Sequence, residues 1–389
     1  MKKTPFVIIL TLFLCACASA QTAEQISAIF SDLTPDAPGA AALVLKNGKT
    51  IFEHGYGVTD LRTKTPIDAH TDFRLASFSK QFTAMSIMLL VHDGKLRYDE
   101  TLCDVFPDFP AYGKTITIRN ILNHTSGLVA YENVMDKRYA GVPDERIPQI
   151  HDDGVLQIMK QQSGTKFPPG SKWEYSNSGY VVLGMVVEKA SGMPFGEFLQ
   201  KRIFAPLGMK NTLAYEKGKN EVPHRAYGHS SVKGTGGWKE TDQSSTSATL
   251  GDGGIYTNLE DLKKWADALD HNKLLSAEEM KPAYAPVVVP RKAPDVNAVE
   301  DGKSDYQEPW DKANPAYGFG WFLDPFQGHR RIFHDGSTIG GKTTIQRLPD
   351  DGITVIILSN RGNFDPGKRT EKILGLFVSP QGVASKQTQ

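Results

Sequence analysis

The stretch LASFSKQFTA (Leu75–Ala84) places a serine three residues before a lysine, at the start of the apolar run AMSIMLLVHDG. Apolar residues recur at helical spacing here, which predicts a helix over residues 78–92. One helical turn separates Ser77 from Lys80, so both side chains lie on one face. A buried and unpaired ammonium costs free energy. Lys80 therefore either reaches solvent or serves a group beside it.

Two interpretations of Ser77 and Lys80 stay open on these ten residues alone. In the first, Ser77 only caps the helix and Lys80 extends its ammonium to solvent. In the second, burial favours the neutral amine of Lys80, because desolvation disfavours the charged form. That amine takes the proton of Ser77 and makes the serine oxygen a nucleophile.

The beginning of the chain has the pattern of an export signal. Two lysines precede a short apolar run, and Ala-Ser-Ala at residues 18–20 fits the cleavage site of a secretory signal peptide. The sequence LCAC at residues 14–17 also resembles a lipobox, which would make Cys17 a lipidated N-terminus. We expect a signal peptide over residues 1–20 and a periplasmic or secreted protein, with a membrane-anchored lipoprotein as the alternative.

The composition excludes several classes of partner. The 389 residues carry 44 basic and 44 acidic side chains, without a basic stripe or an RNA-binding motif, so nucleic acid is not expected. The clusters HDD at residues 151–153 and His224 with His229 match no known zinc spacing, so we expect neither a metal nor another cofactor. After the leader, no segment is apolar enough for long enough to span a bilayer.

Strand signals lie near both ends of the chain, and helical signals lie between them. Asn47-Gly48 and Asp351-Gly352 are turn signals inside β-rich runs, so residues 41–58 and 343–360 predict two hairpins. Helices are expected at residues 179–192, 259–270 and 368–377, and loops at residues 217–249 and 282–315.

These signals predict an α+β protein: an antiparallel β-sheet built from both ends of the chain, with a helical lobe inserted between them. The sheet lobe is expected at about residues 25–95 and 316–377, and the helical lobe at about residues 96–315. Both lobes would belong to one mature domain, residues 21–389. Ser77 then lies where the first sheet segment meets the inserted lobe.

Two further motifs carry candidate chemistry. Tyr175 and Asn177 occur in a polar loop before an apolar helix, where Asn177 or its serine neighbours could simply cap that helix. The alternative is that the Tyr175 hydroxyl shuttles protons and Asn177 binds a substrate carbonyl. His334 lies on or beside a late strand in HDGSTIGG, and the small residues after it would let a substrate approach the backbone.

Taken in order, Ser77-x-x-Lys80, Tyr175-Ser176-Asn177 and His334-Asp335-Gly336 resemble the three motifs of the serine β-lactamase and penicillin-binding protein superfamily. The likeness is greatest to the class C branch, which also holds DD-peptidases, D-amino-acid peptidases and family VIII esterases. Supporting stretches include ILNHTSGL, LGDGGIYTNLEDLKKW and YGFGW, and the likeness covers about residues 25–360.

The resemblance implies an antiparallel β-sheet flanked by helices with an inserted all-helical lobe, and it implies a role for each motif. Ser77 would be the acylated nucleophile, Lys80 and Tyr175 the proton-transfer pair, and Asn177 the group that orients the substrate amide. His334 would polarise Tyr175 and meet a substrate carboxylate. The backbone N–H groups of Ser77 and Ser337 would form the oxyanion hole. The expected site residues are Ser77, Lys80 and Tyr175 for catalysis, and Asn177, His334, Gly336 and Ser337 for substrate binding.

One departure from the family pattern concerns the third motif. β-Lactamases typically carry Lys-Thr-Gly there, whereas this chain has His334-Asp335-Gly336. A histidine is less reliably cationic than lysine at neutral pH, and Asp335 adds negative charge, although on a strand its side chain should point to the other face. A second departure is that no acidic residue is placed like the deacylating glutamate of class A enzymes, so Tyr175 would also serve deacylation.

The resemblance implies an exported serine hydrolase that acts through a Ser77 acyl-enzyme. Its substrate would be a small-molecule or peptide acyl compound of cell-wall type, and esters, amides and D-amino-acid peptides rank above β-lactams. The alternative is a catalytically weak protein of the same fold that binds peptidoglycan or penicillin. A Ser-His-Asp esterase is not favoured, because no Gly-x-Ser-x-Gly motif occurs.

Overall fold

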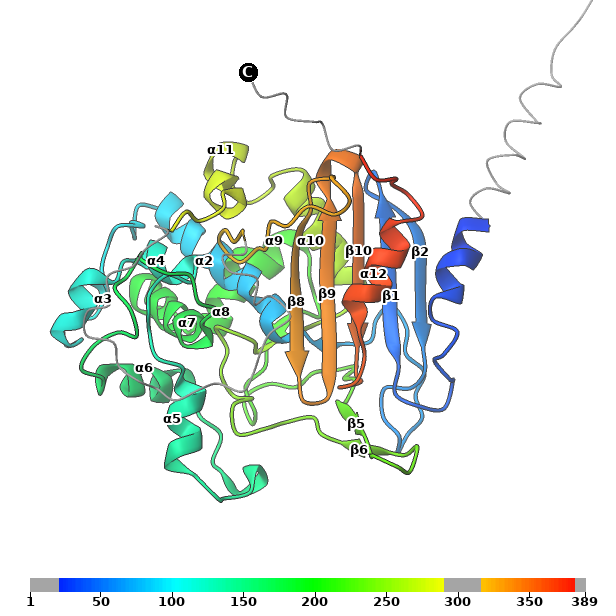
Figure 1. Cartoon of the computed structure of the whole chain (residues 1–389), viewed down its shortest axis with the longest axis horizontal. Helices are drawn as coiled ribbons and strands as arrows, with labels where there is room; N and C mark the ends of the chain where they lie inside the picture. The colour runs from blue at the N-terminus through cyan, green and yellow to red at the C-terminus, as the bar shows by residue number, and fades with distance from the viewer. Residues whose placement is uncertain (1–20, 290–315, 382–389) are drawn as a thin grey trace, which may run out of the picture.

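The computed structural model describes residues 21–289 and 316–381 of the chain (Figure 1). The signal peptide expected at residues 1–20, with Cys17, lies outside the described residues. So does most of the loop expected at residues 282–315. The described part has the predicted α+β architecture, with a sheet on one side and a mainly helical part on the other (Figure 1).

The main sheet joins the two ends of the chain. Its strands follow the order β2-β1-β10-β9-β8, and all neighbours are antiparallel. Asn47 and Gly48 take positive φ angles of 50° and 73° at the first hairpin, and Gly352 takes 62° at the second, so both predicted hairpins are confirmed. The strands are β1 (Ala40–Lys46), β2 (Lys49–Tyr56), β8 (Ile332–Thr338), β9 (Gly341–Leu348) and β10 (Ile353–Ser359).

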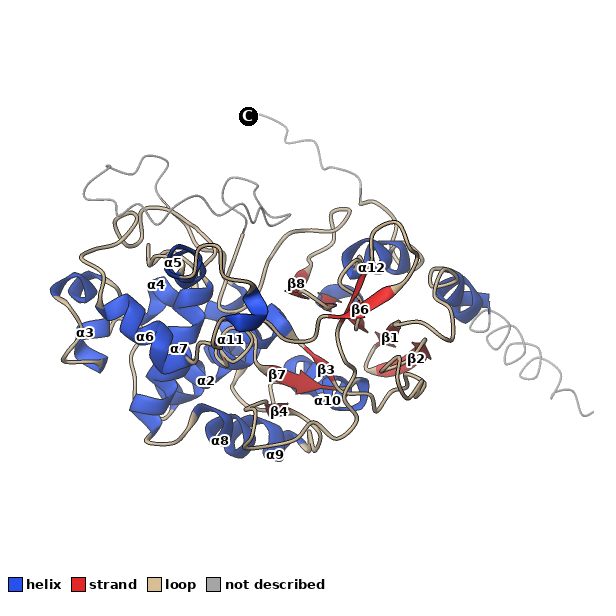
Figure 2. Cartoon of the chain, turned by 90° about the horizontal axis from the view of Figure 1, so that it is seen from below, coloured by secondary structure: helices blue, strands red, loops and turns tan. Residues whose placement is uncertain are grey.

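The two faces of this sheet pack against different cores. On β1, Leu43 belongs to the large core of the helical part, whereas its neighbours Ala42 and Val44 face a smaller core. Helix α12 (Pro366–Leu374) covers the smaller core, and α10 (Leu259–Asp270) packs on the opposite face (Figure 2). Because both faces are covered, every residue of β10 is buried.

The inserted part is mainly helical, but it is not all-helical as predicted. Short strands β4 (Leu213–Ala214) and β7 (Ile255–Thr257) form a small sheet with β3 (Phe73–Arg74). The loop expected at residues 217–249 contains a further strand pair, β5 (His229–Ser231) and β6 (Trp238–Glu240). The small sheet matters for function, because β3 leads directly into the Ser77 segment.

The helices of the inserted part agree well with the sequence pattern. The two longest expected there, at residues 179–192 and 259–270, are present, and Gly192 ends the first with a left-handed conformation. The helices are α2 (Lys80–His92), α3 (Leu102–Val105), α4 (Ile118–Leu122), α5 (Tyr131–Arg138), α6 (Asp152–Lys160), α7 (Asn177–Ser191), α8 (Phe195–Leu199), α9 (Ala205–Leu207) and α11 (Ala277–Met280).

Candidate active site

Ser77 lies in a tight turn between β3 and α2. The turn is a 3-10 helix, Ala76–Ser79, and Ala76 takes a positive φ of 51°, which is rare for a residue with a Cβ. The residue before α2 is Ser79, and neither helix start carries a side-chain cap. The interpretation of Ser77 as only a helix cap is therefore wrong. A strained residue directly before a serine is typical of a functional site.

Lys80 is buried and hydrogen-bonded beside Ser77. Its side chain is fully buried at the start of α2. The Nζ donates to Ser77 Oγ at 3.1 Å, to Asn177 Oδ1 at 2.8 Å and to the Asp252 carbonyl at 3.0 Å. Three oxygen acceptors match the three N–H groups of an ammonium. The lysine is thus held against the serine rather than extended to solvent.

Tyr175 and Asn177 come to the same place from the start of α7. Ser176 caps this helix by accepting from the Gly179 N–H at 3.0 Å, so the capping prediction holds for Ser176, while Asn177 turns to Lys80. The Nζ of Lys80 lies 4.9 Å from the centre of the Tyr175 ring. The same ring also contacts His124, at 4.4 Å between ring centres. These two contacts hold the Tyr175 ring beside Lys80.

His334 reaches the site from the edge strand β8, as the sequence predicted, but it is not a cation. Its Nδ1 lies 2.7 Å from the Asp335 carbonyl, which can only accept, so Nδ1 carries the ring proton. Its Nε2 then accepts from the Tyr317 hydroxyl at 3.1 Å. Burial, helped by the nearby charge of Lys80, lowers the pKa of His334 to about 3. The imidazole is therefore neutral throughout the physiological range.

Gly336 explains why the third motif ends in glycine. A Cβ on Gly336 would lie 2.0 Å from the carbonyl oxygen of Leu75, so only glycine lets β8 approach the serine turn this closely. Thr343 on β9 donates to the same oxygen at 2.8 Å. Asp335 instead contacts Thr344, its partner across β9, on the opposite face of the sheet. The expectation that Asp335 points away from the site is confirmed.

Two acidic residues of the site escaped the sequence analysis. Glu132, on α5, accepts from Asn177 Nδ2 at 2.8 Å. Burial raises the pKa of Glu132 to about 7, and the charge of Asp252 adds to this. Asp252 contributes its carbonyl to Lys80, yet its Oδ1 is buried without a hydrogen-bond partner among the described residues. Neither residue belongs to one of the three motifs on which the sequence analysis relied.

Metal ligation has no support in the part of the chain that the structure describes. No group of three or more histidine, cysteine or acidic side chains is arranged to hold a metal ion within residues 21–289 and 316–381. In the same ranges, no helix has the length and apolar character needed to cross a membrane.

The fold and this arrangement of serine, lysine and tyrosine define the protein as a serine hydrolase. The Beta-lactamase family model matches residues 22–377, and the chain belongs to this family. It is 32% identical over 330 residues to "Penicillin-binding protein 4*" of Bacillus subtilis (strain 168), covering 82% of this chain and 67% of that protein.

Two further comparisons agree with this assignment. The "D-aminopeptidase" of Brucella anthropi is 26% identical over 90% of this chain, which spans 60% of the length of that relative. The solved structure of the D-amino acid amidase from Ochrobactrum anthropi SV3 complexed with L-phenylalanine amide superposes with a TM-score of 0.72 at 24% identity. It covers 91% of this chain and 97% of the other. This structural likeness shows the shared fold.

Proposed function

We propose that the chain is an exported hydrolase that forms an acyl-enzyme on Ser77. We further propose that it prefers amides, peptides or esters of D-amino acids that carry a free ammonium group, and that β-lactams are poor substrates. The observation that carries this proposal is the Glu132 carboxylate, which lies one hydrogen bond from Asn177. The proposal of export rests on the signal-peptide pattern of residues 1–20, with lipidation at Cys17 as the alternative.

The proposed chemistry uses the side chains that meet at Ser77. Acylation proceeds from the neutral amine of Lys80, which remains once its ammonium has released a proton to solvent. As the Ser77 oxygen forms a bond to the substrate carbonyl carbon, this amine accepts the Ser77 proton and passes it to the Tyr175 hydroxyl. The N–H groups of Ser77 and Ser337 stabilise the oxyanion, at about 3 kcal/mol for each donor. Tyr175 then protonates the leaving amine or alcohol as the bond to it breaks. In deacylation the same pair takes a proton from water as the water oxygen bonds to the acyl carbon. The pair returns that proton to the Ser77 oxygen when the bond from this oxygen to the acyl carbon breaks, which releases the acid and regenerates Ser77.

The β8 side of the site argues against a carboxylate-bearing substrate. A neutral His334 supplies no positive charge, so the third motif lacks the cation that a β-lactam carboxylate requires. Lys342 stands opposite Ser337 in the strand pair and contacts its hydroxyl, on the same face as Asp335. It therefore projects from the sheet face opposite to His334.

The α5 side of the site suits a cation. Glu132 is only partly buried, and burial disfavours its charged form, which raises its pKa to about 7. A substrate ammonium close to this carboxylate would favour ionisation and form a charge-assisted hydrogen bond. The buried, unpartnered Oδ1 of Asp252 adds negative potential nearby. An α-ammonium lies next to the scissile carbonyl in amino-acid amides, which fits a subsite beside Asn177.

The relatives support the same substrate class. One is named a D-aminopeptidase and one solved structure is a D-amino acid amidase. The likeness to penicillin-binding protein 4* supports a second candidate, in which the chain binds cell-wall fragments and turns over weakly. Measured turnover separates the two candidates.

The test compares D-phenylalanine p-nitroanilide with its N-acetyl derivative, using the chain and its Glu132→Gln variant. A hydrogen bond to a charged group is worth about 1.5–3 kcal/mol, so Glu132→Gln should lower kcat/KM for the free amine by about 10- to 100-fold. It should leave the N-acetyl compound within about threefold, because glutamine still accepts from Asn177. The exposed Glu145→Gln serves as the matched control and should change neither rate.

An equal loss on both compounds would contradict the ammonium subsite. Absence of turnover on both compounds and on neutral esters would favour the binding-protein candidate. Faster hydrolysis of a penicillin than of the free amide would overturn the proposed preference.

A further inference from the structure

The segment Leu250–Gly254, LGDGG, contacts the catalytic lysine through a backbone carbonyl. Three successive carbonyls of this segment accept from three side chains of the strand and helix around the serine. The Gly251 carbonyl accepts from Thr83 at 2.6 Å, the Asp252 carbonyl from Lys80 at 3.0 Å and the Gly253 carbonyl from Arg74 at 3.2 Å. The middle contact is one of the three that fix the Lys80 ammonium.

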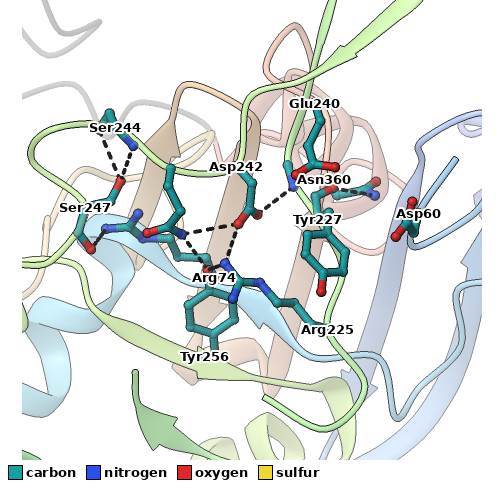
Figure 3. A network of polar contacts seen from close by, with 12 residues as sticks. Asp60, Arg74, Arg225, Tyr227, Glu240, Asp242, Ser244, Ser247, Tyr256 and Asn360 are labelled. Atoms are coloured by element: carbon teal, nitrogen blue, oxygen red, sulfur yellow. Dashed lines mark hydrogen bonds and ion pairs between the residues drawn. The ribbon is translucent and has the colours of Figure 1, made fainter. Parts of the chain in front are cut away.

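Arg74 fixes this segment at two points. Its backbone pairs with Tyr256 between β3 and β7, three residues before the nucleophile. Its Nη2 donates to the Ser247 carbonyl at 3.1 Å while its Nε donates to Gly253, so the guanidinium spans the loop that contains the segment (Figure 3). A planar, permanently charged fork is well suited to holding two carbonyls at a fixed separation.

Asp152 fixes the same segment from the other side. Its carboxylate, at the start of α6, accepts from the Leu250 N–H at 2.9 Å and from the Gly251 N–H at 3.1 Å. Gly251 also lies directly on α7, where a Cβ would come within 2.3 Å of the Tyr180 carbonyl. The segment is thus fixed to α6, α7 and β3 together.

A second set of contacts secures the chain that leads into the segment. Asp242 accepts from Arg225 and from the Gly228 N–H, the latter at 2.8 Å (Figure 3). Arg225 also donates to the Tyr256 hydroxyl at 3.0 Å. These residues hold the loop before Ser247 in place, so that Arg74 meets a fixed partner.

We infer that Arg74 and Asp152 are positioning residues for the acylation step, because they fix the Asp252 carbonyl that holds Lys80 against Ser77. Both side chains bond to the segment that carries this carbonyl, through Gly253 for Arg74 and through Leu250 and Gly251 for Asp152. The inference rests on the proposed role of Ser77 and Lys80, but it does not depend on which acyl group the enzyme accepts. Loss of either anchor lets the Asp252 carbonyl move, and Lys80 then spends less time in reach of the serine oxygen.

The test measures the rate at which a fluorophosphonate probe labels Ser77, because this reaction needs an activated serine but no knowledge of the natural substrate. Rates are compared from pH 5 to pH 10 for the chain, Arg74→Met, Arg74→Lys and Asp152→Asn. We expect Arg74→Met to slow labelling by about tenfold and to move the acid limb of the profile, since Lys80 loses a fixed acceptor. Arg74→Lys keeps one donor and should recover part of the rate.

The matched control is Arg330→Met, which removes an exposed arginine paired with Asp350. It should label at the rate of the unmodified chain. If Arg74→Met does not fold, Asp152→Asn is the second variant, and a severalfold slower labelling with a shifted profile is expected. Folded Arg74→Met or Asp152→Asn with an unchanged rate and profile would overturn the inference. No labelling of the unmodified chain would instead overturn the proposed hydrolase function, and the inference with it.

Discussion

The two sides of the active site differ in how their charges are set. On the α2 side, Lys80 is buried and donates to three oxygens, so a positive charge is stabilised beside Ser77. On the β8 side, His334 is equally buried, and this burial, together with the nearby charge of Lys80, keeps it neutral, while a hydroxyl and a carbonyl fix its tautomer. Burial disfavours a charge at both positions, but only Lys80 has three oxygen acceptors that offset this cost.

The α2 side of the site carries the groups for catalysis, and the β8 side affects which substrates bind. The α2 side keeps the serine and lysine that acyl transfer needs, whereas the β8 side lacks the cation that would bind a carboxylate. The Glu132 carboxylate on α5 adds a negative charge, which favours a substrate that carries a cation over one that carries a carboxylate. We therefore expect changes on the α2 side to remove activity, and changes on the β8 side and at Glu132 to shift preference or stability.

The largest effect is expected from Lys80→Met, which tests whether the α2 side supplies the base for acylation. Methionine fills the same space without a base, so acylation of Ser77 should fall by about 10³-fold. Stopped-flow measurement of the acylation burst with a neutral chromogenic ester gives the rate. Lys95→Met, at an exposed lysine just after the same helix, is the control. A rate within tenfold of the unmodified chain would remove Lys80 from the mechanism.

A smaller effect is expected from His334→Lys, which tests whether the missing cation on the β8 side limits carboxylate binding. A lysine at this position introduces a cation on the face of β8 that carries Gly336. The ratio of kcat/KM for a carboxylate-bearing β-lactam to that for a neutral ester should rise about tenfold, equal to about 1.4 kcal/mol. His334→Gln, which is neutral, should leave the ratio unchanged. An unchanged ratio in His334→Lys as well would show that this position does not set anion binding.

The smallest effect is expected in the stability of Glu132→Gln. The pKa of Glu132 is raised from 4.5 to about 7 by folding, so the folded chain keeps this proton more tightly than the unfolded chain. Wild-type stability contributed by Glu132 is complete below about pH 4.5 and is lost as the pH rises to about 7. Because the side chain is partly open to solvent, the loss is about 1 kcal/mol.

Urea unfolding at pH 5 and pH 8 measures this effect. The Glu132→Gln variant should be more stable than the unmodified chain at pH 8, and this advantage should shrink at pH 5. An advantage that does not depend on pH would contradict the raised pKa.

Local features of the sequence predicted the α2 side and the hairpins. Ser77 and Lys80 are three residues apart on one helical turn, and Asn47-Gly48 specifies its own turn, so neither needs knowledge of distant contacts. Glu132 could not be found in this way, because its partner Asn177 lies 45 residues further along the chain.

The burial of His334 and the short strands escaped prediction for a similar reason. Burial of His334 depends on Tyr317, which approaches from a separate segment. Strands β5 and β6 have three residues each, and their stability comes from contacts to residues far along the chain rather than from their own pattern.

Intact-mass analysis of the protein after reaction with an ester tests whether Ser77 forms the acyl-enzyme. The chain from Gln21 on and its Ser77→Ala variant are each mixed with a short-chain chromogenic ester and quenched during the burst phase. Mass spectrometry of the intact protein then detects the adduct, and peptide mapping locates it. We expect one acyl adduct, on the peptide that contains Ser77, and neither adduct nor turnover in Ser77→Ala. An adduct on another peptide, or turnover that survives in Ser77→Ala, would contradict this expectation.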